Sequence, residues 1–468
     1  MQYDAAMIGL GTMGRNLILN MADNNFSVIG FDANPATAAL LLPEANHNPS
    51  LAIASSLEEM VSKLKTPRRI FMLVPAGKIV DDVLSSLSPF LEKEDIVVDS
   101  GNSFYQDTER RVAEMQQLGI HFVGMGISGG EMGARFGPSI MPGGDKNAWP
   151  RLQPLLEAVS AKVNGEPCVA YMGNKAAGHY VKMVHNGIEY AIMQLISEVY
   201  DVLKHGAKLS NQELHAVFAA WNANELQSFL MEITAKVFLK KDAETNNDLV
   251  DMILDRAGSK GTGKWTSQDA MNLPVSIPTI DMAVAMRDLS AFKAQREQAY
   301  HLYQKKTPEN TAAKEEIIAA AKDALYAATI ICYAQGLAML QQASIKMELA
   351  IPMQDVVKIW RGGCIIRSAS LNDFYKAFVE LPNLQNLLLS PTIASMVTKA
   401  EDGLRKFISL AIQQKIAVAA SASALGYLDA YTSEKMPVNL IQAQRDFFGA
   451  HTYERVDKQG PFHTDWEA

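Results

Sequence analysis

The sequence predicts three parts: an α/β domain in residues 1–175, a large all-helical domain in residues 176–434, and a C-terminal tail in residues 435–468. Eleven of the 19 prolines fall in the first part of the chain. That part alternates short β-rich runs with helical stretches, which is typical of a parallel sheet covered by crossover helices. The second part has long segments rich in Ala, Leu, Met and Glu with a 3.6-residue period, which predicts helices.

The expected strands recur through the first part of the chain. Each is a short apolar run rich in β-branched or aromatic residues and bounded by polar or turn-forming residues. They are residues 5–10, 27–31, 69–74, 95–99 and 121–126. The tail is aromatic and polar and has no clear periodicity, so no regular element is predicted there.

Length and composition restrict the class of protein. At 468 residues and 51.2 kDa the chain is too long for one core, so two or three domains are expected. A hydrophobic content of 48%, with a mean hydropathy of -0.02, indicates a globular protein and excludes a disordered or fibrous chain. A net charge of -8 argues against nucleic-acid binding through bulk charge, but it leaves a local basic pocket open.

Three further features bear on the compartment. Cys168, Cys332 and Cys364 lie far apart, and their odd number suits neither a disulfide framework nor a metal site. The N-terminus runs into an apolar strand without a basic region or a cleavage site, so we expect no signal peptide. Polar residues at 413–415 interrupt the apolar stretch 406–431, so we expect no membrane segment there. These features predict a cytoplasmic protein.

A glycine-rich turn follows the first expected strand and precedes an expected helix. Its residues are Gly9, Leu10, Gly11, Thr12, Met13 and Gly14. Gly9 would allow the tight turn, Gly11 would let the backbone approach a pyrophosphate, and Gly14 would let helix and strand pack closely. The free N–H groups at the helix start would then face the anion. This context predicts a Rossmann-like dinucleotide-binding domain.

Asp32 ends the second expected strand and bears on the choice of cofactor. A carboxylate at this position accepts hydrogen bonds from an adenosine ribose and repels a 2′-phosphate. Ala33 and Asn34 supply no arginine to bind such a phosphate. NAD is therefore favoured, with NADP as the other candidate. The competing interpretation is that Asp32 only caps the next helix.

Residues 258–265 nearly fit the phosphate loop of nucleoside-triphosphate-binding proteins. Trp265, however, stands where that motif needs a Ser or Thr to hold magnesium. Residues 249–256 before the loop also look helical rather than extended. We therefore predict no triphosphate site, although glycine N–H groups beside Lys260 and Lys264 suit a single phosphate.

Four polar residues share one face of an expected helix. Lys182, His185, Asn186 and Glu189 are spaced i, i+3, i+4 and i+7. The alternative is a solvated face, but such faces usually carry Lys/Glu repeats, and this one lies where two domains join. A desolvated lysine can act as a base, and a desolvated glutamate beside it can act as an acid. Such a pair suits dehydrogenation of an alcohol with hydride transfer to nicotinamide.

Seven long strings can be compared with known families. They are residues 9–17 (GLGTMGRNL), 99–103 (DSGNS), 122–144 (FVGMGISGGEMGARFGPSIMPGG), 178–190 (GHYVKMVHNGIEY), 260–266 (KGTGKWT), 361–367 (RGGCIIR) and 445–454 (RDFFGAHTYE). Together they resemble the decarboxylating 6-phosphogluconate dehydrogenase family, over essentially the full length of the chain.

The resemblance implies oxidative decarboxylation of 6-phosphogluconate to ribulose 5-phosphate and carbon dioxide, with hydride transfer to NAD(P). Lys182 would accept the proton of the 3-hydroxyl group and, once protonated, would assist loss of the carboxylate. Glu189 would protonate C1 of the resulting enediol. No metal is implied.

The resemblance also implies the ligand contacts. Cofactor-binding residues would be Gly9, Leu10, Gly11, Thr12, Met13, Gly14, Asp32, Ala33, Asn34, Val74, Pro75, Ala76 and Asn102. The substrate carboxylate and hydroxyls would meet Asn102, Ser128, Gly129, Gly130, His185 and Asn186. The phosphate would meet Tyr190, Lys260, Thr262, Arg287 and Arg445, with His451 beside the sugar. As alternatives, Ser128 is a turn residue, Arg287 a surface cation and His451 a packed tail residue.

The tail has a special place in this family, because it reaches into the partner subunit. The resemblance therefore implies an obligate homodimer in which Arg445 and His451 serve the neighbouring active site. Residues 361–364 are interpreted as a structural bend rather than a substrate contact.

Departures from the family pattern bear on the cofactor. Many members carry Asn-Arg-Thr where this chain has Asp32, Ala33 and Asn34. Pro75 replaces a frequent lysine, and Ser100 replaces a frequent glycine. These departures favour NAD and leave the proton-transfer residues untouched.

Two alternatives remain open at this point. The first is a 3-hydroxyacid dehydrogenase without decarboxylation, such as one acting on 3-hydroxyisobutyrate. Such enzymes are usually shorter and tend to show Lys-x-x-Asn-Asn, where this chain has Lys182 followed by His185 and Asn186. The second is a catalytically silent NAD-binding sensor or scaffold, which predicts a broken polar face.

Overall fold

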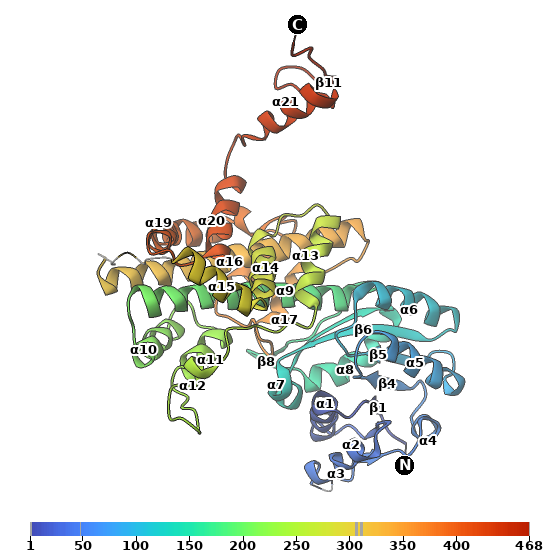
Figure 1. Ribbon diagram of the computed structural model, residues 1–468. Coiled ribbons are helices and arrows are strands. Elements are labelled where there is room, and N and C mark those ends of the chain that lie inside the picture. Colours follow the sequence, from blue (N-terminus) through green and yellow to red (C-terminus); the bar gives the residue numbers. More distant parts are fainter. Residues whose placement is uncertain (1, 47, 305–307, 309–311, 468) are drawn as a thin grey trace.

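Seven strands form one sheet in the N-terminal part of the chain (Figure 1), in a computed structural model that describes residues 2–46, 48–304, 308 and 312–467. The strand order is β3-β2-β1-β4-β5-β6-β7, and all neighbours are parallel except β6 and β7. The strands are β1 Ala5–Ile8, β2 Val28–Phe31, β3 Leu51–Ile53, β4 Arg69–Met72, β5 Ile96–Asp99, β6 His121–Ser128 and β7 Ser139–Gly144.

Helices cover both faces of this sheet. Ala5 and Met7 of β1 pack in a core shared with α1 and α8, whereas the alternate residues Ala6 and Ile8 pack in a core shared with α4, α5 and α6. The helices are α1 Thr12–Asp23, α2 Pro35–Ala39, α3 Leu41–Glu44, α4 Leu57–Ser62, α5 Lys78–Leu87, α6 Tyr105–Gln117, α7 Gly130–Phe136 and α8 Trp149–Val159. A ribbon of β8 Lys162–Val163 and β9 Glu166–Pro167 follows. The predicted Rossmann-like domain is therefore confirmed.

All five expected strands are present, with small shifts at their ends, but the prediction missed β3 and β7. The sheet is also not wholly parallel, because β7 runs antiparallel to β6. Pro142 and two glycines hide β7 in the sequence, and an edge strand tolerates them. Gly143 is needed for close packing, since a Cβ there would lie 2.2 Å from the backbone nitrogen of Gly178.

The long helix α9 (Ala177–Asp201) packs against strands of the sheet at its start and continues into the helical part. A Cβ at Gly126 of β6 would lie 2.4 Å from the Cβ of Lys182, so this glycine allows the helix to approach the sheet. The π-helical turn η3 (Val202–Gly206) extends α9. One rigid element therefore connects the two domains.

The second part of the chain is helical, which confirms the predicted fold class. Its helices are α10 Asn211–Asn222, α11 Phe229–Val237, α12 Leu249–Met252, α13 Thr262–Asn272, α14 Pro278–Ser290, α15 Lys293–Tyr303, α16 Lys314–Lys346, α17 Met353–Trp360, α18 Leu371–Glu380, α19 Pro391–Gln413 and α20 Ala419–Tyr431. By length and composition α16 could cross a membrane, but 67% of its most apolar window is buried inside the protein. It is the central core helix, packed against α9 and α19.

The tail contains regular structure that the sequence did not predict. It forms α21 (Val438–Gly449) and a hairpin of β10 (Tyr453–Glu454) and β11 (Pro461–Phe462). Figure 1 shows this segment extending away from the helical domain. The apolar residues of α21 are exposed in the single chain. The helix therefore has no buried apolar face, which is the feature that a helical periodicity predicts.

Candidate active site

The glycine turn after β1 leaves an open approach to the start of α1. Gly9 has a φ of +90°, and a Cβ at Gly14 would lie 1.9 Å from the Gly9 carbonyl oxygen. A Cβ at Gly11, by contrast, would meet nothing within 4 Å. Gly11 precedes α1, and no side chain caps the helix. The uncapped backbone N–H groups at the start of α1 are therefore available to an anion.

Asp32 makes its contacts within the neighbouring turns. Its carboxylate accepts hydrogen bonds from the backbone N–H of Leu10, at 2.7 Å, and of Asn34, at 2.8 Å. The cap of α2 is Asn34, whose side chain accepts from the N–H of Ala36. The interpretation of Asp32 as a helix cap is therefore wrong: it joins the glycine turn to the turn after β2.

A cavity of about 620 Å³ opens at the carboxyl ends of β1, β2 and β4, and we call it the sheet-edge cavity. Two carboxylates line it, Asp32 and Asp82, and Lys78 pairs with Asp82 at 2.5 Å. Among the described residues, no lysine or arginine lines it. Of the predicted cofactor residues, those that line it are Gly9, Gly11, Asp32, Ala33, Val74 and Pro75. Leu10, Thr12, Gly14, Asn34 and Ala76 do not.

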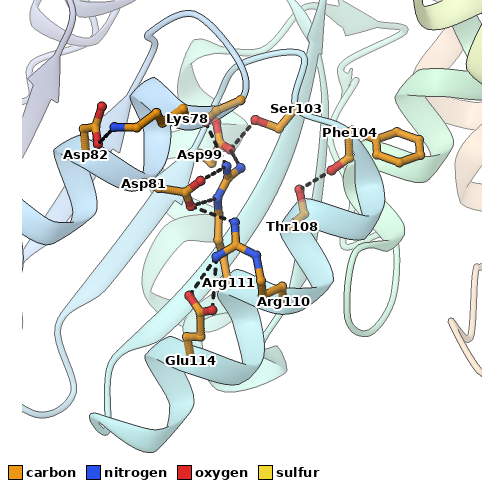
Figure 2. Close-up of polar contacts among 11 residues, drawn as sticks. Lys78, Asp81, Asp82, Asp99, Ser103, Phe104, Thr108, Arg110, Arg111 and Glu114 are labelled. Carbon is orange, nitrogen blue, oxygen red and sulfur yellow. Dashed lines mark hydrogen bonds and ion pairs between the residues drawn. The ribbon is translucent and has the colours of Figure 1, made fainter.

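Arg111 of α6 holds the loop that follows β4. Figure 2 shows its guanidinium group pointing at Asp81. Its Nε and Nη2 donate to the Asp81 carboxylate at 2.7 and 3.0 Å, and Nη2 also donates to the Gly77 carbonyl at 2.9 Å. Arg111 is fully buried, so these contacts fix the segment that begins with Val74 and Pro75.

The same guanidinium group approaches the loop that carries Asn102. Its Nη1 lies 3.7 Å from Asp99 Oδ2 (Figure 2). Asp99 is itself buried and accepts hydrogen bonds from the N–H of Gly101, at 3.0 Å, and from the hydroxyl of Ser103, at 2.6 Å. The residues on both sides of Asn102 are therefore fixed.

His179 connects this loop to α9. Its Nε2 donates to the Asp99 carbonyl at 3.1 Å, because a carbonyl can only accept. Burial lowers the pKa of His179, although the nearby Asp99 raises it in part. In the neutral ring Nδ1 then accepts from the Thr108 hydroxyl, at 2.7 Å. The Asn102 loop is thus joined to the helix that carries Lys182 one turn further on.

A second cavity, of about 600 Å³, lies between the two domains, and we call it the interdomain cavity. The predicted site residues that line it are Met13, Asn102, Ser128, Gly129, Gly130, Lys182, Asn186, Glu189, Tyr190, Lys260, Thr262 and Arg287. Met13 comes from the same glycine turn as Gly11, which lines the sheet-edge cavity. His185 lies behind the cavity wall.

Lys182 and Glu189 face this cavity from α9. Lys182 is 7% exposed, and burial lowers its pKa below the ordinary value, although Glu189 opposes this shift. Burial raises the pKa of Glu189, whereas Lys182 and Arg287 oppose that shift. The interpretation of this face as solvated is therefore wrong. The pKa values of Lys182 and Glu189 therefore move toward each other, which favours a state in which the two groups share one proton.

His185 is fully buried and organises the wall. Its Nε2 lies 3.2 Å from the Ser128 hydroxyl, and its Nδ1 lies 3.1 Å from Asn186 Oδ1 and 3.5 Å from Lys182 Nζ. Burial, together with the charge of Lys182, lowers the pKa of His185 well below its ordinary value. The edge of its ring contacts Trp360. His185 is therefore a neutral hydrogen-bonding group that holds Ser128, which is more than a turn residue.

Cationic groups gather at the α13 end of the interdomain cavity. The Arg287 guanidinium lies over the Tyr190 ring at 3.6 Å, and its Nη1 donates to the Gly258 carbonyl at 3.3 Å. Thr262 begins α13 directly after Gly261, whose φ is +94°, and no side chain caps this helix. With Lys260, these groups have the charge and the free N–H groups that suit a single phosphate. Arg287 is not a simple surface cation.

The loop before α13 agrees in part with the sequence analysis. The preceding segment is helical as predicted, but α12 ends at Met252 rather than at residue 256. Gly263 lies against Tyr190, because a Cβ there would be 2.5 Å from the ring. The glycines of this loop therefore serve the contact between α13 and α9.

The sequence analysis missed five residues that line the interdomain cavity: Ile127, Met193, Gly258, Ser259 and Ile365. Met193 lies four residues after Glu189 on the same face of α9, so helical spacing could have found it. Ile365 gave no such signal. Residues 361–364 do not line the cavity, and the carbonyl of Gly363 instead accepts from the N–H of Ser139, at 2.8 Å.

Arg445 and His451 lie outside both cavities of their own chain. Arg445 is exposed on α21, and His451 is exposed in the turn after it, with its ring edge against Phe448. Figure 1 shows this segment apart from the body of the protein. A single chain does not bring these two residues to the other predicted substrate contacts.

The fold and the glycine turn are those of a dinucleotide-binding oxidoreductase. Two family profiles match the sequence. The NAD binding domain of 6-phosphogluconate dehydrogenase matches residues 4–209, and the 6-phosphogluconate dehydrogenase C-terminal domain matches residues 178–466.

Characterised relatives match over nearly the whole chain. The NADP(+)-dependent decarboxylating 6-phosphogluconate dehydrogenase of Bacillus subtilis is 50% identical, with 98% of each chain covered. The decarboxylating enzyme of Mus musculus is 45% identical over 99% of this chain and 97% of its own. The solved 6-phosphogluconate dehydrogenase of Plasmodium falciparum, described in complex with NADP+ and with its substrate, is 40% identical, with a TM-score of 0.96 and coverage of 99% of this chain and 100% of that one. The chain belongs to the 6-phosphogluconate dehydrogenase family.

Proposed function

We propose that this protein oxidises and decarboxylates 6-phosphogluconate to ribulose 5-phosphate and carbon dioxide, with NAD as the preferred hydride acceptor. One observation carries the proposal. The interdomain cavity brings Lys182 and Glu189 together with a phosphate site and with Met13 of the glycine turn. Relatives at 45–50% identity bear the name of this activity.

The residues around the glycine turn fit a dinucleotide. The open space at Gly11 and the uncapped start of α1 suit a pyrophosphate, and the sheet-edge cavity suits the adenosine half. When bound, the nicotinamide ring of the dinucleotide accepts the hydride from C3 of the substrate. Met13 and Asn102 line the interdomain cavity and were predicted to contact the cofactor, so they would lie between cofactor and substrate.

Lys182 and Glu189 would move the protons. Neutral Lys182, favoured by burial, takes the proton of the 3-hydroxyl group as the hydride leaves C3. The resulting 3-keto acid loses its carboxylate as carbon dioxide, and the bond electrons pass to the C3 carbonyl. Lys182, now protonated, returns its proton to that oxygen. Glu189, whose pKa burial raises, then protonates C1 of the enediol, and Lys182 takes back the proton of the enediol hydroxyl to give the ketone.

The other polar groups of the interdomain cavity would hold the substrate at its two ends. Lys260, Thr262 and Arg287 suit the phosphate, and Tyr190 lies beneath the Arg287 guanidinium. At the opposite end, Ser128, Gly129, Gly130, Asn102 and Asn186 would contact the carboxylate and hydroxyls. Neutral His185 keeps the Ser128 hydroxyl and the Asn186 amide in place.

The NAD preference rests on the charge of the sheet-edge cavity. A 2′-phosphate would meet the carboxylates of Asp32 and Asp82 there, with no cation lining the described part of the wall. Two like charges about 4 Å apart cost on the order of 4 kcal/mol near a surface. The Bacillus subtilis relative is NADP(+)-dependent, so the proposed NAD preference rests on the residues of this chain alone.

The tail supports a homodimer in which each subunit completes the site of the other. Arg445 and His451 are predicted substrate contacts, yet they lie outside their own cavity. The tail also exposes Leu440, Phe447 and Phe448, which are 62%, 55% and 72% exposed in the single chain. Such an apolar surface is typical of a segment that packs against a partner.

The test is the rate of cofactor reduction with 6-phosphogluconate, measured in parallel with NAD and NADP and with carbon dioxide release. We expect fast reduction of NAD, slow reduction of NADP, one carbon dioxide for each reduced cofactor, and no turnover by Lys182→Met. Preference for NADP would overturn the cofactor assignment alone. Reduction without carbon dioxide would favour a hydroxyacid dehydrogenase, and no reduction by folded protein would favour a silent binder.

A further inference from the structure

The tail folds around one buried carboxylate, that of Asp446 on α21. Asp446 Oδ1 accepts hydrogen bonds from the N–H of Thr452, at 3.0 Å, and from His463 Nδ1, at 2.9 Å. Its Oδ2 accepts from the N–H of Thr464, at 3.1 Å, and from Trp466 Nε1, at 2.8 Å. Asp446 therefore gathers α21, the turn after it and the end of the chain into one unit.

The turn that carries His451 has an unusual backbone. Ala450 and Thr452, on either side of His451, have φ values of 49° and 59°. Left-handed conformations are rarely adopted by non-glycine residues, least of all by a β-branched one, because they are strained. Both neighbours of His451 are therefore held in backbone conformations that they would rarely adopt without the surrounding contacts.

Gln442 joins this turn to Arg445. Its Nε2 donates to the carbonyl of Thr452, and its Oε1 accepts from Arg445 Nη1, at 3.1 Å. Gln442 lies three residues before Arg445 on α21, so the two side chains share one face of the helix. One amide group therefore fixes both the guanidinium group and the turn that carries the imidazole.

These contacts are local to the tail. Within the described residues, each hydrogen bond found for the side chains of Gln442 and Asp446 ends on a residue of the segment 442–466. Neither residue depends on the body of the subunit. The arrangement is complete in a single chain, before any partner is present.

We infer that Gln442 and Asp446 are positioning residues that pre-form the Arg445–His451 pair for the active site of the partner subunit. The inference rests on the proposed function and on tail exchange. A tail that is already folded loses less conformational freedom when it meets the substrate, so the pair contributes more to binding. Gln442 is the sharper probe, because its amide contacts Arg445 and the carbonyl of Thr452, the residue after His451, without filling the buried centre.

The first experiment compares Gln442→Met, Gln442→Glu and the control Gln444→Met. Gln444 is exposed on the same helix. We expect Gln442→Met to raise the KM for 6-phosphogluconate about tenfold, as loss of a hydrogen bond to a charged group implies. The KM for NAD, the Tm and the dimer content should stay unchanged. Gln442→Glu can still accept from Arg445 but cannot donate to Thr452. Its KM for 6-phosphogluconate should therefore lie between those of the wild type and Gln442→Met.

A wild-type KM for Gln442→Met would overturn the inference and leave the proposed function intact. So would a raised KM that returns to normal at protein concentrations where the variant is fully dimeric, because the defect would then be one of assembly. An equal effect in Gln444→Met would also overturn it. Wild-type protein that does not turn over 6-phosphogluconate would instead contradict the proposed function.

The second experiment uses a mixed dimer of Gln442→Met and Lys182→Met subunits, purified with two different tags. Its one working Lys182 site receives the intact tail of the Lys182→Met subunit. We expect a wild-type KM for 6-phosphogluconate and about half the wild-type kcat, as one of two sites is active. A mixed dimer that keeps the raised KM would show that the tail acts within its own chain, and would overturn the inference.

Discussion

The two cavities of this protein are of similar volume, about 620 and 600 Å³, but they differ in charge. Side-chain carboxylates line the sheet-edge cavity, whereas Lys182, Lys260 and Arg287 line the interdomain cavity. Both are suited to ligands that carry phosphate. The first offers backbone N–H groups at the start of α1, and the second offers side-chain cations as well as the start of α13.

This difference shows how an acidic protein can bind two anions selectively. Backbone N–H groups donate to a pyrophosphate without adding charge, so the adjacent carboxylates can still repel an additional phosphate. Side-chain cations attract a phosphate strongly, whereas burial lowers the pKa of Lys182. Charge therefore sets specificity in the sheet-edge cavity, and burial sets the reactivity of Lys182 in the interdomain cavity.

The largest effect is expected at the reactive end of the interdomain cavity. Lys182→Met removes the base and should lower kcat about a thousandfold, within the range found for general bases. NAD binding, followed by quenching of protein fluorescence, should be unchanged because Lys182 does not line the sheet-edge cavity. A variant that keeps more than a tenth of the wild-type kcat would remove Lys182 from the mechanism.

Glu189→Gln should have the next largest effect, a fall in kcat of about a hundredfold. Loss of the acid affects protonation of C1 and not oxidation at C3. A single-turnover experiment should therefore still show cofactor reduction before product forms. Equal slowing of both steps would contradict a role confined to the later proton transfer.

Arg287→Met tests the cationic end of the same cavity. Loss of a charged partner should raise the KM for 6-phosphogluconate about tenfold or more, with little change in the KM for NAD. Arg405→Met is the matched control, since Arg405 is an exposed arginine paired with Glu401 and Asp429. Equal changes in the KM for 6-phosphogluconate in both variants would show that Arg287 has no specific role in binding the phosphate.

The sheet-edge cavity can be altered by combining Asp32→Asn with Ala33→Arg. Removing a carboxylate and adding a cation should raise the ratio of kcat/KM for NADP over NAD about tenfold or more. The single variant Asp82→Asn measures what the second carboxylate adds. If the ratio does not change in any of these variants, charge in this cavity does not select the cofactor.

The smallest effect concerns pH. Lys182 must be unprotonated to act as a base, so kcat/KM should rise with pH as the lysine loses its proton. The negative charge of Glu189 raises the pKa of Lys182. Glu189→Gln removes that charge, so the rising limb of the profile should move to lower pH. A shift to higher pH would show that the two groups do not interact as their positions indicate.

Much of the fold was predictable because its signals are local. The alternation of short strands and helices, the glycine turn and the spacing on α9 depend on neighbouring residues, and each reappears in the structure. β7 was missed because Pro142 and two glycines are unusual in a strand, and Gly143 serves a contact with Gly178 of α9, which lies far away in the sequence. The helix α21 was missed because its apolar side chains face outward in the single chain.

The site shows the same limit. Residues on one helix face were grouped correctly by spacing, whereas Ile365 and Ser259 entered the interdomain cavity only through the packing of distant segments. Asp32 was predicted to be a ribose ligand, with a helix cap as the alternative, and the sequence did not show that its carboxylate accepts hydrogen bonds from the turns on either side. No sequence pattern states which hydrogen bonds a carboxylate already makes.

Lys182 and Glu189 lie on one unbroken helix, so the number of residues between them determines the relative direction of their side chains. Each residue turns an α-helix by about 100°, so seven residues return the side chain to nearly the same direction. Insertion or deletion of a single residue between them would rotate Glu189 out of the interdomain cavity, although every side chain would remain. Residues of this stretch of α9 that face away from the interdomain cavity can therefore vary. The number of residues between Lys182 and Glu189 cannot change if both side chains are to face that cavity.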